Sequence, residues 1–280
     1  ESWLNYAKRH SLGVICITGE LIAPEDPMYK NGSWQKLLAP KALTERYPQV
    51  ERMCLLDTDV KIGPFAPNIF SDAKEGVYSV VSLIRDLPFS REEVTRRMAF
   101  FRNKYYSNKF PLDSALVGDV FQEFRDLQLT PPENYFCGGL LVLDASHAQE
   151  MEDWFLETKD SESFDSWEQT HLNFWVQRKP HSFLPYEYQA IWYYEMAHKY
   201  PFLYELGKSI GSSRIALQCV KTSLWNNHFL HFAGSWFESM AWKIDETSDK
   251  EFMGGFDSYS SEYEDLSNIA FTGQRVGKIL

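Results

Sequence analysis

Apolar residues in this chain gather in short runs of strand length, which alternate with longer segments that repeat their apolar residues at helical spacing. The clearest run covers residues 53–56, and it ends directly in Asp57, Thr58 and Asp59. An unbroken apolar run of this length is typical of a strand buried on both faces. By similar patterns, strands are predicted for residues 12–18, 76–84, 135–144, 215–220 and 228–232.

Helices are predicted between these strands. Helical spacing is found over residues 2–9, 34–46, 167–177, 188–200 and 236–242, and Pro40 is expected to break or kink the second of these helices. Ser90 is followed three residues later by Glu93, which forms a capping box at the start of a helix. Residues 146–149 are expected to cap the helix that carries Trp154.

The alternation of strands and helices favours an α/β fold with a mixed, mostly parallel central sheet flanked by helices. No internal repeat and no linker rich in Gly, Pro or Ser divides the chain. A single domain is therefore predicted for residues 1–245. Residues 246–280 form an acidic segment rich in Ser and Tyr that has no apolar periodicity.

The two acids that follow residues 53–56 are the strongest chemical signal. In an extended chain, residues two apart point the same way, which places the Asp57 and Asp59 carboxylates roughly 7 Å apart on one face. Two ionised carboxylates repel each other unless a proton or a cation lies between them. Oxygen ligands favour magnesium, calcium or manganese, so the pattern predicts a divalent cation site at the end of this strand.

Charge and hydropathy restrict the partners. The chain has 280 residues with 28 basic and 39 acidic side chains, and its formal charge of -11 argues against a nucleic acid or an anionic membrane as the main partner. A nucleotide that carries its own metal ion stays compatible with this charge. No apolar run approaches the roughly 20 residues that a membrane-spanning helix needs, and the first residues do not resemble a signal peptide.

The cysteines bear on the compartment. Cys16, Cys54 and Cys137 stand in apolar runs, which predicts buried, reduced thiols and favours the cytoplasm. Asn31-Gly32-Ser33 would be a glycosylation acceptor in a secretory compartment. A location in the Golgi lumen would follow if an anchor precedes this sequence.

Short motifs follow one another in a fixed order over residues 34–234. They are Trp34-Gln35-Lys36, the strand with Asp57-Thr58-Asp59, Cys137-Gly138-Gly139-Leu140, Glu168-Gln169 with Leu172-Asn173, and His231-Phe232-Ala233-Gly234. In this order they resemble the GT-A class of nucleotide-sugar glycosyltransferases, especially the glycogenin and lipopolysaccharide galactosyltransferase type and the galactomannan and xyloglucan transferases. The resemblance implies a Rossmann-like GT-A fold. It also implies sugar transfer from a nucleotide-diphosphate sugar, with a UDP-sugar favoured, to a glycan or other acceptor hydroxyl.

The resemblance also implies the metal ligands. Asp59 would bind Mn²⁺ or Mg²⁺ directly, Asp57 would bind the metal, the ribose or both, and His231 would be the third protein ligand. The ion would stabilise the charge that grows on the departing diphosphate. His228 is expected to face the opposite way if its strand is extended.

Further roles are implied for the other motif residues. Gly138 and Gly139 would let the backbone approach a sugar hydroxyl, and Gly234 would do the same beside the diphosphate, although a β-bulge or turn explains these glycines equally well. Glu168 would orient the donor sugar, assist the acceptor, or cap the helix that follows it.

Weaker candidates complete the set of binding residues. Trp34 and Lys36 would contact the nucleotide or the donor, although a Trp at helical spacing with leucines is more often part of a core. Asp113 is a looser candidate for the donor hydroxyls, because an Asp in a segment such as Pro-Leu-Asp-Ser more often belongs to a solvated turn.

The chain departs from the family pattern in two places. Most members begin with a strand that binds the nucleotide base, whereas this chain begins with a predicted helix, so the base-binding strand is absent or lies upstream. Glycogenin-like enzymes place Lys-Pro-Trp soon after the histidine motif, whereas this chain has Ser235-Trp236-Phe237. Lys221 or Arg214 could replace the lysine that usually contacts the phosphates.

Alternatives remain open on the sequence. Aspartyl-phosphate phosphatases also place two Asp residues after an apolar strand, but they need Thr or Val where this chain has Lys61. A transferase-like binding protein without turnover is disfavoured because an unused acidic pair confers only repulsion. Among transferases, retention is favoured because the resemblance is strongest to retaining groups. Inversion would instead require Glu168 or Asp113 as a base.

Overall fold

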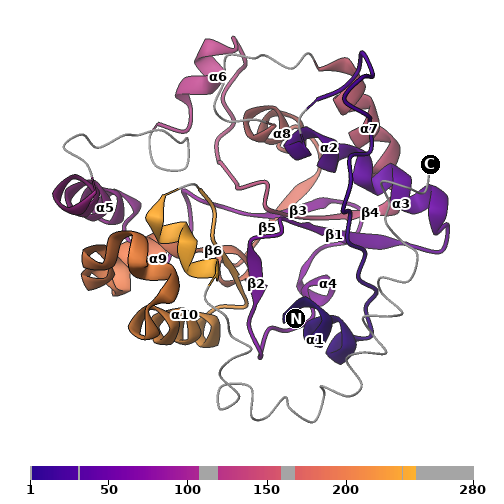
Figure 1. Cartoon of the computed structure of the whole chain (residues 1–280). Coiled ribbons are helices and arrows are strands. Elements are labelled where there is room, and N and C mark those ends of the chain that lie inside the picture. The colour runs from indigo at the N-terminus through magenta and orange to yellow at the C-terminus, as the bar shows by residue number, and fades with distance from the viewer. Residues whose placement is uncertain (1, 31, 107–118, 159–167, 235, 244–280) are drawn as a thin grey trace.

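The computed structural model describes residues 2–30, 32–106, 119–158, 168–234 and 236–243. The candidate donor contact Asp113 and the predicted acidic segment 246–280 lie outside the described residues. Within the described part, two small sheets and the helices around them form a mixed α/β architecture (Figure 1).

The larger sheet contains β1 (Arg52–Leu56), β3 (Tyr78–Val81), β4 (Leu140–Asp144) and β5 (His181–Leu184). Its strand order is β1-β4-β3-β5. β4 runs antiparallel to both of its neighbours, whereas β3 and β5 are parallel. The prediction of a mostly parallel sheet is therefore wrong for the described strands. The reversal of β4 places its first residue, Leu140, opposite Leu56 at the end of β1.

The smaller sheet contains β2 (Val60–Ile62), β6 (Ala190–Ile191) and β7 (Phe229–His231), in the order β2-β7-β6. β7 is antiparallel to β2 and parallel to β6. Because β2 begins directly after the two acids that follow β1, the acids lie at the junction of the two sheets.

Helices surround both sheets. They are α1 (Ser2–His10), α2 (Gly32–Gln35), α3 (Ala39–Arg46), α4 (Ile69–Asp72), α5 (Arg91–Tyr105), α6 (Gln122–Asp126), α7 (Ala148–Glu157), α8 (Gln169–Val176), α9 (Trp192–Lys199) and α10 (Arg214–Asn226), with 3₁₀ helices η1 (Lys36–Leu38), η2 (Ala145–His147), η3 (Tyr186–Gln189), η4 (Pro201–Ser212) and η5 (Phe237–Lys243). In Figure 1, α2, α3, α7 and α8 lie on one side of the larger sheet, and α1 and α4 lie on the other. None of the helices in the described ranges is long and apolar enough to cross a membrane.

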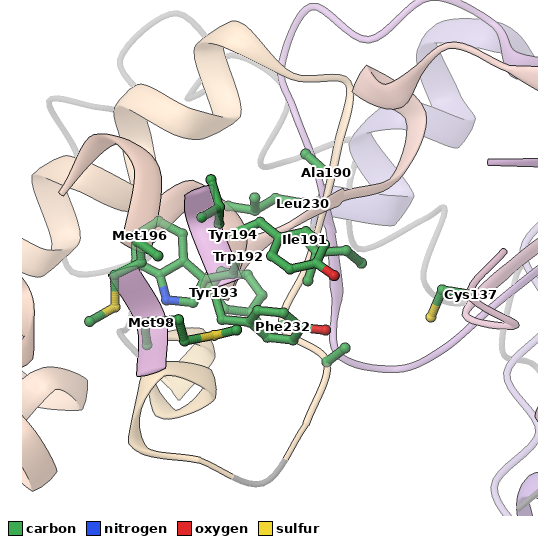
Figure 2. Packing of buried hydrophobic residues seen from close by; sticks show 14 of the residues in the cluster. Met98, Cys137, Ala190, Ile191, Trp192, Tyr193, Tyr194, Met196, Leu230 and Phe232 are labelled. Atoms are coloured by element: carbon green, nitrogen blue, oxygen red, sulfur yellow. The ribbon is translucent and has the colours of Figure 1, made fainter. Parts of the chain in front are cut away.

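β4 separates two of the hydrophobic cores. Leu141 and Leu143 pack in the core that α7 and α8 cover, whereas Leu140 and Val142 pack in the core that α1 and α4 cover. This alternation follows from the period of two along a strand. A third core joins β6 and β7 to α5, α9 and α10. Figure 2 shows Trp192, Tyr193 and Phe232 of this third core beside Met98 and Met196.

Several predicted helix boundaries are confirmed. The helical segment 34–46 is divided into short pieces, and Pro40 stands in the first turn of α3, where a missing backbone N–H costs least. The Ser90 hydroxyl accepts a hydrogen bond from the Glu93 N–H at 3.3 Å and caps α5. The cap predicted from residues 146–149 is wrong, because α7 begins after His147 without a side-chain cap bond.

Two predicted strands are also wrong. Residues 12–18 form no strand: a cavity lies between them and the open edge of β1, and none of the described strands pairs with them. For the same reason β1 is only partly buried, with Met53 as its one buried residue. Residues 215–220 belong to α10, in which Ala216, Cys219, Val220 and Leu224 are buried at helical spacing.

None of the four cysteines, all of which lie in the described residues, forms a disulfide. Cys137 is buried as predicted, whereas Cys16 and Cys54 are only half-buried because they lie beside the cavity along β1.

Candidate functional site

The segment Asp57-Thr58-Asp59 is fixed by backbone hydrogen bonds from both sheets. The Asp57 N–H donates to the Gly139 carbonyl at 3.0 Å, and the Phe232 N–H donates to the Asp59 carbonyl at 3.0 Å. These bonds tie the segment to the beginning of β4 and to the end of β7. Regions far apart in the sequence therefore meet at the two acids.

Strand pairing brings His231 to these acids. In the β2–β7 pair, His231 stands opposite Val60, which is the residue that follows Asp59 in the sequence. The His231 Nε2 lies 3.2 Å from Asp59 Oδ1, and ligand atoms of Asp57, Asp59 and His231 all lie within 4.8 Å of one another. Two carboxylates and one imidazole are a donor set that fits Mn²⁺ or Mg²⁺. The three residues assigned to the metal thus form one cluster.

Asp59 and His231 shift each other's pKa. Burial alone would raise the pKa of Asp59, but the hydrogen bond and charge of His231 hold it below its ordinary value. Burial alone would lower the pKa of His231, but Cys137 and Asp59, beside its two ring nitrogens, raise it above the ordinary value. A divalent ion between these groups would replace the imidazole proton as the positive charge that the carboxylates require.

Three neighbours enclose the rest of the His231 ring. The Cys137 Sγ lies 3.6 Å from Nδ1, and the Gln189 side-chain nitrogen lies 3.2 Å from the same atom. A Cβ added to Gly139 would stand 2.2 Å from the ring atom Cε1. Gly139 is therefore required to make room for His231. At Gly138 the nearest atom to an added Cβ is Gln169 Oε1 at 3.1 Å, so the space there is less restricted than at Gly139.

A second charged cluster lies beside Asp57. Lys36 Nζ lies 3.0 Å from Asp57 Oδ1 and 2.7 Å from Glu168 Oε1, and it donates to the Gly138 carbonyl at 3.3 Å. Burial would lower the pKa of Lys36, but the two carboxylates outweigh it and raise this pKa above its ordinary value. The ammonium group is therefore a fixed positive charge next to the metal cluster.

α8 delivers Glu168 and Gln169 to the start of β4. The Gly138 N–H donates to Gln169 Oε1 at 2.8 Å, and the Gln169 amide donates back to the Phe136 carbonyl. Glu168 stands before the first residue of α8 but makes no side-chain cap bond, so the capping alternative is wrong. Glu168 is 4% exposed, and its carboxylate binds Lys36 instead.

The other candidate residues do not join this cluster. Trp34 is 1% exposed and packs in the core, so we leave it out of the proposed ligand contacts. Gly234 is exposed and has a φ of 95°, a left-handed conformation that favours glycine. Lys221 is buried in α10 and Arg214 is exposed at its first turn, and neither lines the cavity that the described residues form.

A cavity of about 1190 Å³ opens beside the acids. One wall consists of residues 12–21 and another of β1, and Lys36, Asp57 and Asp59 line the cavity where β1 ends. The segment in which a strand was predicted therefore forms a wall of this cavity.

Sequence reasoning missed Gln189. This residue ends η3 and directly precedes β6, whose pairing with β7 brings it beside His231. Its only sequence signal was its place before the short apolar pair Ala190-Ile191, which lay inside a predicted helix. Cys137 belongs to the Cys137-Gly138-Gly139-Leu140 motif, but no pattern in the sequence places it against His231.

Comparison with known proteins gives two structural matches. No protein-family model and no curated protein matches the chain. A glycosyltransferase involved in the glycosylation of the major capsid of PBCV-1 matches with a TM-score of 0.42 and 9% identity, over 79% of this chain and 81% of that chain. The apo structure of the bifunctional glycosyltransferase WbbM matches with a TM-score of 0.42 and 14% identity, over 85% of this chain and 38% of that chain. Similarity at this level carries no argument about activity, which has to rest on the residues of the site.

Proposed function

We propose that this protein is a metal-dependent glycosyltransferase. It would transfer a sugar from a nucleotide-diphosphate sugar, with UDP-sugars favoured, to a hydroxyl of a glycan or other acceptor. The observation that supports this most directly is the convergence of Asp57, Asp59 and His231 within 4.8 Å of one another. Two of these residues line a cavity of about 1190 Å³, which is a suitable size for a nucleotide sugar.

In this proposal the protein positions charge around the departing diphosphate. Asp57, Asp59 and His231 hold Mn²⁺ or Mg²⁺, which supplies the positive charge that stabilises the leaving group. Lys36 adds a second positive charge that is oriented by Glu168 and by the Gly138 carbonyl. The GT-A family assignment and the choice of nucleotide belong to the same proposal.

The ion pair of Glu168 supports retention of the anomeric configuration. A general base for inversion must be able to take a proton from the acceptor hydroxyl. Glu168 is 4% exposed and its Oε1 lies 2.7 Å from the Lys36 ammonium, so its carboxylate is held inside the protein in an ion pair rather than presented to an acceptor hydroxyl. We therefore assign Glu168 to orienting Lys36 and the donor sugar, with the departing diphosphate accepting the acceptor proton.

The experiment is calorimetric titration of the protein with UDP, and separately with GDP, in the presence of Mn²⁺. We expect UDP binding that disappears when the metal is chelated, and Asp59→Asn should weaken it at least tenfold because a ligand is lost. Asp153→Asn, an exposed acid on α7, is the matched control and should bind like the wild type.

Two results would overturn the proposal. Binding of neither nucleotide would favour a protein without transferase activity. Unchanged Mn²⁺ binding and donor hydrolysis in Asp59→Asn would remove the assigned metal site. The anomeric configuration of the product, read by NMR, separates retention from inversion.

A further inference from the structure

His231 has two ring nitrogens with different surroundings. Nε2 lies 3.2 Å from Asp59 Oδ1, whereas Nδ1 faces the interior, where the Gln189 side-chain nitrogen lies 3.2 Å away. The His231 side chain is 3% exposed and Gln189 is 0% exposed. Both nitrogens therefore depend on protein groups for their hydrogen bonds.

The backbone keeps Gln189 beside the ring. Gln189 directly precedes β6, in which Ile191 pairs with His231 in parallel register. Two residues before Gln189, the Glu187 carbonyl accepts a hydrogen bond from the His228 N–H at 2.8 Å. The backbone on both sides is fixed and the two side chains are buried. The Gln189 amide can therefore change from hydrogen-bond donor to acceptor mainly by turning about its last side-chain bond.

A metal at Nε2 determines what Nδ1 requires. The metal needs the lone pair of Nε2, so the proton of a neutral imidazole must then reside on Nδ1. A buried N–H without an acceptor is costly, and ligating histidines accordingly donate this proton to a partner in the protein. The Cys137 thiol, at 3.6 Å, is only a weak acceptor.

The Gln189 amide can serve both states of the ring. As it stands, the amide nitrogen faces Nδ1 at 3.2 Å and can donate to it whenever Nδ1 carries no proton. A half-turn of the amide exchanges nitrogen and oxygen at nearly the same positions, and the oxygen then accepts a proton from Nδ1.

We propose that Gln189 is a positioning residue for the metal site: its amide oxygen accepts the Nδ1 proton of His231 and thereby presents the Nε2 lone pair to the metal. This inference rests on the metal site of the proposed function. It adds a requirement beyond the three metal ligands, namely a hydrogen-bond acceptor for Nδ1, on the side of the His231 ring away from the metal.

The test compares Gln189→Leu, Gln189→Glu and the wild type by two measurements that need no turnover. The first is Mn²⁺ affinity, measured by titration in the presence of UDP. Gln189→Leu should bind Mn²⁺ about 10–100-fold more weakly, the range typical for lost partners of ligating histidines. Gln189→Glu can accept the Nδ1 proton and should stay within a few-fold of the wild type.

The second measurement is NMR of the imidazole nitrogens with Mg²⁺ and UDP. The wild type should show His231 protonated on Nδ1, with slow exchange of that proton, and Gln189→Leu should show faster exchange. Gln177→Leu is the matched control, because Gln177 donates to the Asn134 carbonyl rather than to His231. It should match the wild type in both measurements.

The outcomes separate the two proposals. If the wild type binds no metal with UDP, the proposed function fails and this inference fails with it. If the wild type binds metal and Gln189→Leu binds it equally well with an unchanged NMR signal, only this inference fails. Weaker metal binding in Gln189→Leu that Gln189→Glu does not restore would also overturn it, because a merely structural role predicts that result.

Discussion

Gly139 lies so close to His231 that a Cβ on it would stand 2.2 Å from the ring atom Cε1 and 2.8 Å from Nδ1. The ring has little space into which to retreat, because Gln189 and Cys137 lie beside Nδ1 and Asp59 lies beside Nε2. A residue without a Cβ is therefore required at position 139 if His231 is to keep its position. This requirement couples the start of β4 to the end of β7.

Gly139→Ala should displace the His231 ring from Asp59. We expect at least a tenfold loss of Mn²⁺-dependent UDP binding, and a loss of about 1–3 kcal/mol in the free energy of unfolding, as is usual for overpacking. Calorimetry and urea denaturation measure the two effects. Gly138→Ala is the matched comparison and should lose less of both, because the nearest atom to its added Cβ is Gln169 Oε1 at 3.1 Å, whereas the Cβ at Gly139 would stand 2.2 Å from the ring. Equal losses in the two variants would contradict the steric argument.

Lys36→Met should affect stability and metal binding in opposite directions. Removing the ammonium leaves Asp57 and Glu168 without their shared cation, and breaking such a buried pair costs about 3–5 kcal/mol. The partial exposure of Asp57 places the expected loss near the lower end of that range. Mn²⁺ alone should bind more tightly, because a positive charge beside the site is removed.

Urea denaturation and Mn²⁺ titration measure these two effects. Lys41→Met is the control, because Lys41 forms an i,i+4 pair with the exposed Glu45 that should contribute about 0.5 kcal/mol or less. Metal binding that weakens in Lys36→Met would contradict the charge argument.

The position of the acidic pair follows from local signals, whereas the assignment of His231 to the same site rests on the family resemblance. The apolar run that ends in Asp57 and Asp59 is visible in a few residues, and alternation along a strand separates His231 from His228, which packs against Tyr188 with ring centroids 4.8 Å apart. Both patterns depend only on the geometry of an extended chain.

The features that sequence reasoning missed depend on pairing between distant segments. The direction of β4 is set by its contact with the end of β1, and nothing in its own residues encodes it. Residues 12–18 have the composition of a strand, but a cavity separates them from the open edge of β1. Gln189 reaches His231 only because β6 pairs with β7, and a two-residue strand is too short to produce a period.

The buried pair of Arg102 and Glu238 should stabilise the segment that follows His231. Arg102 Nε lies 2.8 Å from Glu238 Oε1, the two side chains are 1% and 0% exposed, and the Trp192 indole donates to the Glu238 carbonyl at 2.8 Å. Glu238→Gln leaves a buried guanidinium without its counter-charge, so unfolding should become easier by about 3–5 kcal/mol in urea denaturation.

A double variant tests the cause of this loss. Arg102→Met with Glu238→Leu removes both charges and should recover most of the stability, because paired apolar replacements of a buried ion pair are often neutral. Glu92→Gln is the control, because its pair with Arg96 is exposed. Should the double variant be less stable than Glu238→Gln, the attribution to an uncompensated charge would be wrong.

His228 should make the protein less stable as the pH falls. Burial lowers the pKa of His228 below its ordinary value, although Glu187 and Asp72 partly oppose this. The unfolded chain therefore binds the proton first, so the contribution of His228 is fully present well above the unfolded pKa of about 6.5 and is lost as the pH falls through that value toward the folded pKa. Urea midpoints at pH 7.5 and 5.5 should differ less in His228→Gln than in the wild type. His181→Gln, at the start of β5, should keep the wild-type difference. Parallel pH dependence in wild type and His228→Gln would show that His228 is not the group responsible.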